Sequence, residues 1–199
     1  NPSLNPVFRL KENGSTRGLL TSSSSIGISA ETTGALPFQI NTNSVLRVKV
    51  DENGHTTMPL QPAFMAKLTN EQSDMTNNSA HNTLAFATEI FDQNADYNNS
   101  NYIFTAPLTG RYQLSFAIYM EEIDTAADYF YIALRTSNRD VFYIADPNFS
   151  ADMAYFTVAG SLLSDMDVND TAYVTFVQAS GTAQVNATVH SYFSGFLAC

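Results

Sequence analysis

The sequence predicts an all-β protein built around an antiparallel two-sheet jelly-roll sandwich. Three observations indicate this fold. Apolar residues alternate with period 2 along several segments, turn residues separate these segments at short intervals, and no useful length of chain has helical periodicity. A count of about eight to ten strands without crossover helices indicates antiparallel strands in two packed sheets.

The chain divides into two regions, which we predict to be a β-rich attachment or stalk segment at residues 1–60 and a jelly-roll head at residues 61–199. In the first region, apolar and polar residues alternate over residues 36–40 and 45–50, and residues 51–54 supply a turn. This region holds too little apolar material for a core of its own. We therefore expect it to need neighbours, either other subunits or a larger assembly.

In the head, the strongest alternation runs over residues 112–120, where five apolar side chains share one face. The pattern returns at Phe130, Ile132 and Leu134, at Val174 and Phe176, and at Val185, Ala187 and Val189. Turns are expected at residues 107–110, 138–140 and 164–170.

Four segments of the head, in this order, resemble the complement-1q/tumour-necrosis-factor-like globular head family. They are residues 62–66, 104–116, 159–174 and 192–197. The family usually has Gly before Asp170, and Asn169 stands there in this sequence; Asn also tolerates a left-handed turn. The resemblance implies a two-sheet jelly roll that packs as a homotrimer around a threefold axis.

The resemblance also indicates which residues build the structural core. Each aromatic side chain there is expected to contribute roughly 1.5–3 kcal/mol through burial. Gly110 is expected to allow the turn after Pro107, and Gly195 to let two backbones approach closely. The expected core positions are Phe64, Phe104, Gly110, Tyr112, Phe116, Gly160, Phe193, Gly195 and Phe196. Further tyrosines are candidates for subunit contacts or for an ordinary strand surface: Tyr129, Tyr131, Tyr143, Tyr155 and Tyr173.

A second resemblance concerns residues 33–54, where an apolar strand, an Asn-rich turn, a strand with an Arg and a D-x-x-G turn follow one another. This order is similar to the pattern that precedes receptor-binding tips in phage tail-fibre and related virion proteins. The alternative interpretation is a generic β-hairpin.

Together the resemblances imply a trimeric virion-surface structural protein: a tail fibre, a head fibre or a capsid-decoration protein. Residues 1–60 would contact other virion proteins, and the head would attach to a host cell-surface glycan or protein. The alternative is a secreted, extracellular complement-1q-like recognition protein that binds glycans or proteins. That alternative would require a signal peptide and often a collagen-like G-X-Y stalk upstream.

Several classes of function are disfavoured by the sequence. A net charge of -10 disfavours binding to nucleic-acid phosphates, and no apolar run approaches the ~20 residues needed to insert into a membrane. No H-E-x-x-H, G-x-S-x-G or P-loop motif is present, so we expect no enzyme. The chain begins at Asn1 without an initiator Met or a signal peptide, which indicates processing or truncation.

No cofactor is expected. Asp165, Asp167 and Asp170 share one turn but lack the Gly and terminal Glu of an EF-hand, so solvated carboxylates are the better interpretation. Some members of the resembled family bind calcium, which leaves a calcium site open with no ligand assigned. The single cysteine, Cys199, rules out a disulfide within the chain.

Topology indicates where a ligand would bind. Loops alternate between the two ends of an antiparallel sandwich, so residues 121–128, 147–153 and 180–185 should meet at the end away from the attachment segment. Loops on a rigid β scaffold commonly carry recognition, and these have polar groups suited to hydroxyl-rich ligands such as glycans. The alternative is ordinary solvated loops. The candidate ligand-binding residues are Glu121, Glu122, Asp124, Asp128, Asn148, Asp152, Ser180 and Thr182.

Overall fold

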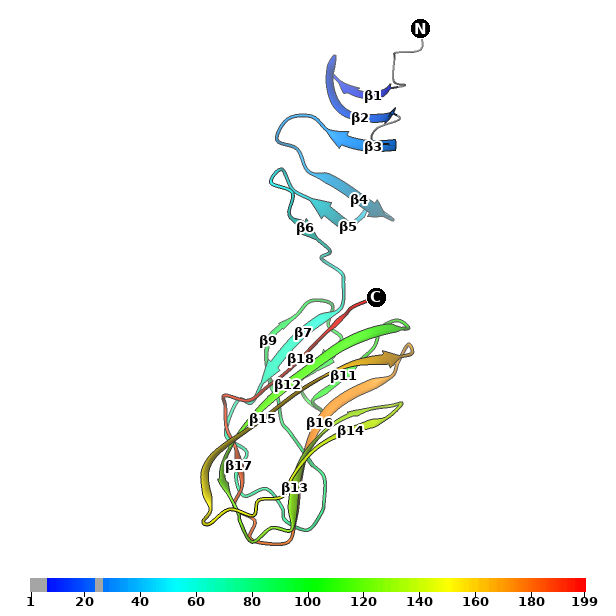
Figure 1. Ribbon diagram of the computed structural model, residues 1–199. Helices are drawn as coiled ribbons and strands as arrows, with labels where there is room; N and C mark the ends of the chain where they lie inside the picture. Colours follow the sequence, from blue (N-terminus) through cyan, green and yellow to red (C-terminus); the bar gives the residue numbers. More distant parts are fainter. Residues whose placement is uncertain (1–6, 24–26) are drawn as a thin grey trace. The chain divides into compact units, whose positions relative to one another are not determined.

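The computed structural model describes residues 7–23 and 27–199, and every regular element in them is a β-strand (Figure 1). The chain forms two compact units, Asn1–Leu60 and Gln61–Cys199. No helix in the described part of the chain is long and apolar enough to cross a membrane.

The first unit contains two three-stranded antiparallel sheets, ordered β1-β2-β3 and β4-β5-β6. Their strands are β1 (Val7–Glu12), β2 (Ser15–Ser23), β3 (Gly27–Thr32), β4 (Phe38–Thr42), β5 (Val45–Val50) and β6 (Thr56–Thr57). The strand expected at residues 45–50 is β5, with the same bounds. The turn expected at residues 51–54 is closed by a hydrogen bond of 3.0 Å from the Gly54 N–H to the Asp51 carbonyl.

The second unit, the head, consists of two six-stranded antiparallel sheets that face each other (Figure 1). The first sheet has the order β15-β12-β18-β7-β9, with β17 beside β12; the second has the order β10-β11-β16-β13-β14, with β8 beside β16. The all-β, two-sheet prediction is confirmed. The strands are β7 (Ala63–Lys67), β8 (Asn82–Thr83), β9 (Thr88–Asp92), β10 (Tyr97–Asn98), β11 (Ile103–Thr105), β12 (Gly110–Ile123), β13 (Tyr129–Thr136), β14 (Asp140–Ala145), β15 (Met153–Met166), β16 (Thr171–Ala179), β17 (Asn186–Ala187) and β18 (Tyr192–Leu197).

The head has twelve strands, more than the expected eight to ten, because three of them span only two residues. Such short pairings leave no period-2 pattern to find in the sequence. Val189 was expected to continue the alternation after Ala187, but β17 ends at Ala187 and Val189 is 39% exposed in the following turn.

The core lies between the two sheets, as the alternation along β12 predicts. Tyr112, Leu114, Phe116, Ile118 and Met120 are each at most 1% exposed. Since successive side chains of a strand point to opposite faces, the intervening residues 113, 115, 117 and 119 lie on the outer face of the first sheet.

Aromatic rings join the two sheets. Phe64 stacks on Phe104 at 4.8 Å and on Tyr97 at 5.0 Å between ring centroids, and it meets Phe193 edge-on at 5.0 Å. Such pairs add about 0.5–1.5 kcal/mol to the burial of the rings. The buried Tyr97 hydroxyl donates to the Phe86 carbonyl at 2.9 Å, and burial raises the pKa of Tyr97.

Three of the expected core glycines leave space for a neighbour. A Cβ on Gly195 would lie 2.7 Å from Leu114 Cδ2, and one on Gly160 would collide with the ring of Tyr143. Gly110 differs from the expectation, because it begins β12 without a positive φ and its missing Cβ makes room for Leu197 Cδ1 at 2.6 Å.

Phe196 is wrongly placed in the core by the sequence analysis. It is 50% exposed, whereas Phe193, Gly195 and Leu197 face the interior. The side chains of β18 alternate, so Phe196 lies on the outer face of the first sheet. Asn169 behaves as expected, with the left-handed φ of 72°.

Candidate functional site

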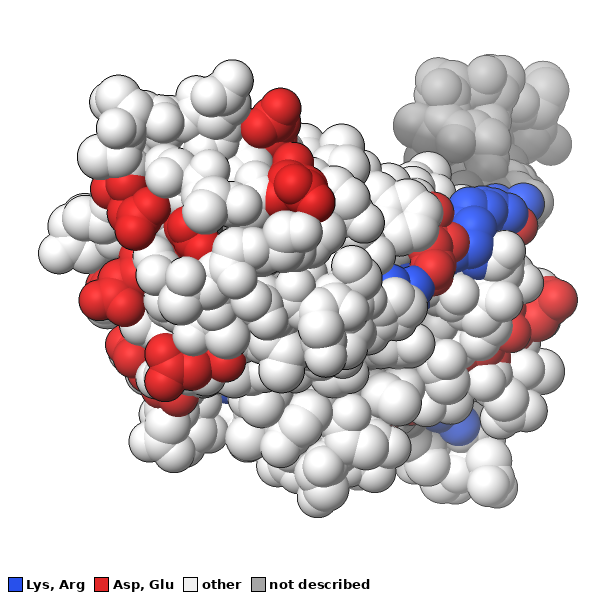
Figure 2. Space-filling view, turned by 90° about the horizontal axis from the view of Figure 1, so that it is seen from below, with Lys and Arg blue, Asp and Glu red and all other residues white. Residues whose placement is uncertain are grey.

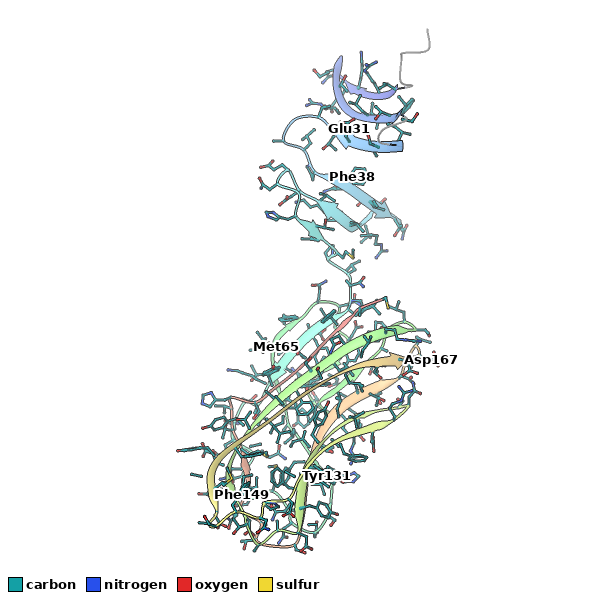
Figure 3. All side chains as sticks on the ribbon, in the orientation of Figure 1. Glu31, Phe38, Met65, Tyr131, Phe149 and Asp167 are labelled. Carbon is teal, nitrogen blue, oxygen red and sulfur yellow. The ribbon has the colours of Figure 1, made fainter. Side chains whose placement is uncertain are left out.

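Three connections of the head meet at one end of the sandwich: residues 121–128, which include the last residues of β12, residues 147–153, which end at the first residue of β15, and residues 180–185 after β16. We call this end the apex. Glu121 and Glu122 therefore lie in a strand and not in the expected loop. Hydrogen bonds described below tie the three connections together, so the structure brings together the loops that the strand order indicated. Phe149 lies at this end and Asp167 at the opposite end (Figure 3).

Asp152, on the connection 147–153, forms hydrogen bonds with the other two connections. Its Oδ1 accepts from the backbone N–H of Thr125 at 3.0 Å and from the Thr125 hydroxyl at 2.9 Å. Its Oδ2 accepts from the side-chain amide of Gln184 at 3.1 Å. Because these donors favour the charged carboxylate, chiefly the Thr125 N–H, the pKa of Asp152 is lowered.

Asp124 differs from the expectation that it lies exposed for a ligand. Its side chain is 4% exposed; its Oδ1 accepts from the Ala126 N–H at 2.7 Å and its Oδ2 from the Thr182 N–H. A buried carboxylate with both oxygens occupied by backbone donors supports the loops and does not face a ligand.

The Ser180–Gly181 turn is held from both sides. The Ser180 hydroxyl donates to Asp128 Oδ2 at 2.7 Å. The amide of the buried Gln178 donates to the carbonyls of Ser180 and Thr182, each at 2.9 Å. Ser180 and Thr182 themselves are exposed, so the turn presents their side chains on a rigid support.

A shallow pocket of about 380 Å³ opens at the apex, lined by Glu122, Asp152, Met153, Ala154 and Gln184. Two of these residues, Glu122 and Asp152, were expected at the site. Glu122 has a φ of 57°, a conformation that costs a non-glycine residue about 1 kcal/mol or more, and such strain is concentrated at functional positions. Its carbonyl accepts from the Gln184 amide at 3.2 Å.

Gln184 was not predicted as a site residue, although it lies in the predicted 180–185 loop. No local pattern marks it, because its position in the pocket depends on contacts with residues 122 and 152. Asn148 is exposed on the second connection but does not line the pocket, and Glu121 is half-buried in β12.

The apex carries negative charge. The three connections and their neighbouring residues contribute Glu121, Glu122, Asp124, Asp128, Asp146 and Asp152, whereas residues 112–134 and 140–199 contain no Lys or Arg. Figure 2, seen from below, shows several Asp and Glu residues gathered on the left of the visible face. The apex therefore repels anionic ligands and favours neutral or cationic ones.

Within the described residues, no group of three or more His, Cys, Asp or Glu side chains is arranged to hold a metal ion. The calcium site that the sequence analysis left open stays without assigned ligands. Cys199 is a free, exposed cysteine.

The opposite end of the head is closed by turns, as expected. Arg139 forms an ion pair with Asp165, and the Asn138 amide donates to Asp170 Oδ2 at 2.9 Å. The Gln61 amide donates to the Leu197 carbonyl at 3.4 Å, so the head begins at this end. The expectation that these acids are only solvated is incomplete for Asp165, because the Arg139 hydrogen bond lowers its pKa.

A second surface lies on the outer face of the first sheet. Small and uncharged side chains occupy its middle, and large apolar ones occupy one end, where Phe91, Phe196 and Leu163 are 49%, 50% and 55% exposed. A groove of about 350 Å³ runs across part of it. We call this surface the uncharged face, and it comprises Met65, Phe91, Gln113, Ser115, Ala117, Ala159, Ser161, Leu163, Ser194 and Phe196.

A third surface lies on the edge strand β14, where Phe142 and Ile144 are 52% and 65% exposed. The ring of Tyr131 meets Phe142 edge-on at 5.1 Å. Tyr143, on the same strand, points inward onto Phe116 at 4.9 Å. We call Phe142 and Ile144 the edge patch.

We expect acidification to loosen the apex. A carboxyl group whose pKa is lowered by folding stabilises the folded state above its unfolded pKa, and this contribution is lost as the pH falls through the folded value. For Asp152 the loss should occur below the ordinary value of 3.8. An NMR titration of the Asp152 carboxyl carbon and the Thr125 amide measures it.

In the wild type, the chemical shift of the Thr125 amide should change with pH at the same midpoint as that of the Asp152 carboxyl carbon. In Asp152→Asn the Thr125 amide should no longer change at that pH. A carboxyl midpoint at or above 3.8 would show that the hydrogen bonds to Asp152 are not made in solution.

Comparisons with known proteins agree with this architecture. The C1q domain family model matches residues 63–198. Among solved structures, the globular domain of zebrafish complement 1qA protein is 16% identical, with 70% of this chain and 98% of that chain aligned and a TM-score of 0.51. Murine APRIL at pH 8.0 is 10% identical, with 69% and 98% aligned and a TM-score of 0.50. At these identities the likeness shows the fold alone. No curated protein sequence matches the chain.

Proposed function

The chain belongs to the C1q domain family, and we propose that it is a non-enzymatic recognition protein that acts as a homotrimer and binds its target through the apex. C1q and tumour-necrosis-factor-like domains typically form homotrimers and mediate binding, and C1q-domain proteins are typically extracellular. The observation that carries the proposal is the apex, where three connections enclose a polar pocket at the end of the head opposite to Gln61.

Two exposed apolar surfaces support the trimer. A closed ring of three identical chains uses heterologous contacts, in which one patch of each chain meets a different patch of the next. The uncharged face and the edge patch are two such patches on one chain. The small residues Ser115, Ala117 and Ala159 would let a neighbouring chain approach the middle of the sheet closely.

The setting we propose is a virion surface, where the protein would serve as a fibre or as a capsid-decoration protein. Residues 1–60 would then join other virion proteins, and the head would attach to a host cell-surface glycan or protein. The exposed apolar side chains of the first unit support an assembled role, since Phe8, Leu10 and Leu20 are 64%, 58% and 48% exposed. A secreted, extracellular recognition protein with the same head is the second candidate, favoured by the typical location of the family.

The ligand class follows from the charge of the apex. Pocket groups that accept and donate hydrogen bonds, Glu122, Asp152 and Gln184, suit sugar hydroxyls, while the surrounding carboxylates repel sialic acid and sulfate groups. We therefore propose a neutral glycan. Three copies of the pocket on one trimer would multiply a weak individual affinity.

A glycan microarray that holds neutral, sialylated and sulfated oligosaccharides tests this proposal. The labelled wild-type chain should bind neutral glycans, and the double variant Glu122→Gln, Gln184→Ala should bind at least tenfold more weakly without a change in native mass. The control Asp167→Asn, which removes a carboxylate at the opposite end, should bind like the wild type. Equal binding by the pocket variant would place the ligand elsewhere, and binding to anionic glycans alone would refute the charge argument.

A further inference from the structure

The first unit contains a structural repeat, in which one hairpin follows another with the same strand pairing. In the first hairpin, Phe8 pairs with Leu20 and Leu10 with Gly18; in the second, Phe38 pairs with Val50 and Ile40 with Val48. The same number of positions that separates Phe8 from Phe38 also separates Leu10 from Ile40, and each of the other residues from its equivalent in the second hairpin. The irregularity in the register recurs at the same interval, between Leu10 and Lys11 and between Ile40 and Asn41.

The turns of the two hairpins repeat as well. Asn13 and Gly14 have φ values of 49° and 78°, and Asn43 and Ser44 have 50° and 60°. Two successive left-handed residues form the tight turn that matches the twist of a β-hairpin. The chain therefore uses one hairpin design twice.

An arginine at the same position secures each hairpin. Arg17 Nε donates to Glu12 Oε2 at 3.1 Å, and Arg47 Nε donates to Thr42 Oγ1 at 2.6 Å. Arg47 and Thr42 occupy the places in the second hairpin that Arg17 and Glu12 occupy in the first. Because this bond crosses the two strands next to the turn, it fixes the same geometry in both copies of the design.

The repeat places a row of apolar side chains on one face of each hairpin. Residues that pair across antiparallel strands lie on the same face, so Phe8, Leu10 and Leu20 share one face of the first sheet. Phe38, Ile40 and Val50 do so in the second, where Phe38 and Ile40 are 37% and 47% exposed. The opposite faces carry Val7 and Leu19 together with charged and polar residues: Arg9, Glu31, Gln39 and Lys49.

This unit has no core of its own in the part that the structure describes. The buried hydrophobic residues of the described chain begin at Phe64, in the head. A groove of about 480 Å³ crosses the apolar row and is lined by Phe8, Leu10, Leu20, Ala30 and Phe38 among others. An isolated two-stranded hairpin is marginally stable in water, and a three-stranded sheet gains stability when it removes its apolar face from water.

We propose that the occupant of this apolar face is the same face of two further copies of this chain, so that residues 7–23 and 27–57 of three chains form a shaft with a shared apolar interior. The inference rests on the proposed homotrimer, since a trimeric head holds three copies of the first unit at high local concentration. The apolar residues recur at a fixed interval along the chain, so they can pack against a partner whose apolar residues recur at the same interval. Another copy of this chain is such a partner.

Cysteine cross-linking of the full-length chain tests the shaft, in a Cys199→Ser background. Leu20→Cys places a thiol on the apolar face, and Arg9→Cys, on the neighbouring strand, places it on the opposite face and outside the groove. Val50→Cys and Lys49→Cys form a second matched pair. Under mild oxidation, the Leu20 and Val50 variants should give at least tenfold more covalent dimer than their controls, because three thiols meet inside the shaft.

Light scattering on the same samples separates the two proposals. A trimer without face-selective cross-links would overturn the shaft and leave the proposed function standing; this result is also expected if another protein covers the face. A monomer would overturn both.

Hydrogen exchange gives a second test of the shaft. It is measured on chains without an added cysteine, so it does not depend on the folding of the cysteine variants. Amides of residues 7–23 and 27–57 should exchange at least tenfold faster when Ala117→Arg separates the heads. Unchanged exchange in that monomer would show that the first unit does not depend on other copies.

Discussion

Replacing Ala117 with Arg is expected to convert the protein from a trimer to a monomer. Ala117 lies at the end of the uncharged face farthest from Phe196, between Ala159 and Tyr192, and is half-buried on the outer side of β12, so the single chain has room for a longer side chain. In a trimer the guanidinium groups would be buried without partners, and each such charge costs on the order of several kcal/mol. Native light scattering should show a fall from three times 21.8 kDa to 21.8 kDa.

A control variant and an unfolding measurement show whether loss of the trimer is due to the charge at position 117. Asn99→Arg adds the same charge in an exposed loop between β10 and β11, away from the uncharged face and the edge patch, and should remain trimeric. Thermal unfolding of the Ala117→Arg monomer should still be cooperative, because its core is untouched. A wild-type monomer, or an Ala117→Arg trimer, would mean that the uncharged face is not the contact between subunits.

Gly181→Ala is expected to disrupt the apex. Gly181 has a φ of 74°, which costs an L-residue roughly 1–2 kcal/mol. A Cβ there would collide with the Asp124 carboxylate and lie 2.9 Å from the Ala127 backbone nitrogen. Pushing Asp124 aside leaves the N–H groups of Ala126 and Thr182 without their acceptor, which adds about 1–3 kcal/mol.

Denaturant unfolding measures this loss, and hydrogen exchange over residues 121–128 locates it. Ser180→Ala is the control in the same turn, because it removes only the bond to Asp128 and adds no atoms. Both residues are exposed, so this loss should be about 0.5–1.5 kcal/mol. If Gly181→Ala were as stable as the control, Asp124 would not organise the apex as the structure shows.

Much of the head could be predicted from the sequence, because burial and alternation are local properties of a strand. Tyr112, Leu114 and Phe116 face the core at the spacing that the pattern requires. Phe196 was misplaced for the same physical reason, since a neighbour of a core residue in a strand must point outward. Leu84, Phe86 and Tyr97 are buried but were not predicted, because they lie in irregular segments or two-residue strands.

The candidate site was predicted as three loops with eight polar residues, of which only Glu122 and Asp152 line the pocket. Strand order indicated that residues 121–128, 147–153 and 180–185 meet, but it could not show which side chains face outward. Asp124 and Asp152 look alike in the sequence. Asp124 is buried and accepts from two backbone N–H groups, whereas Asp152 accepts from Gln184 and lines the pocket with it.

The sequence by itself determined that the chain is all-β and that the head resembles the complement-1q-like family, and it predicted that the first sixty residues hold too little apolar material for a core of their own. These conclusions depend on patterns that each strand carries alone. The tertiary structure decided which carboxylates are buried, which faces stay uncovered and that the two hairpins of the first unit share one register. The aligned residues are rarely identical, so the repeat emerges from hydrogen-bond pairing between strands, which a sequence does not display.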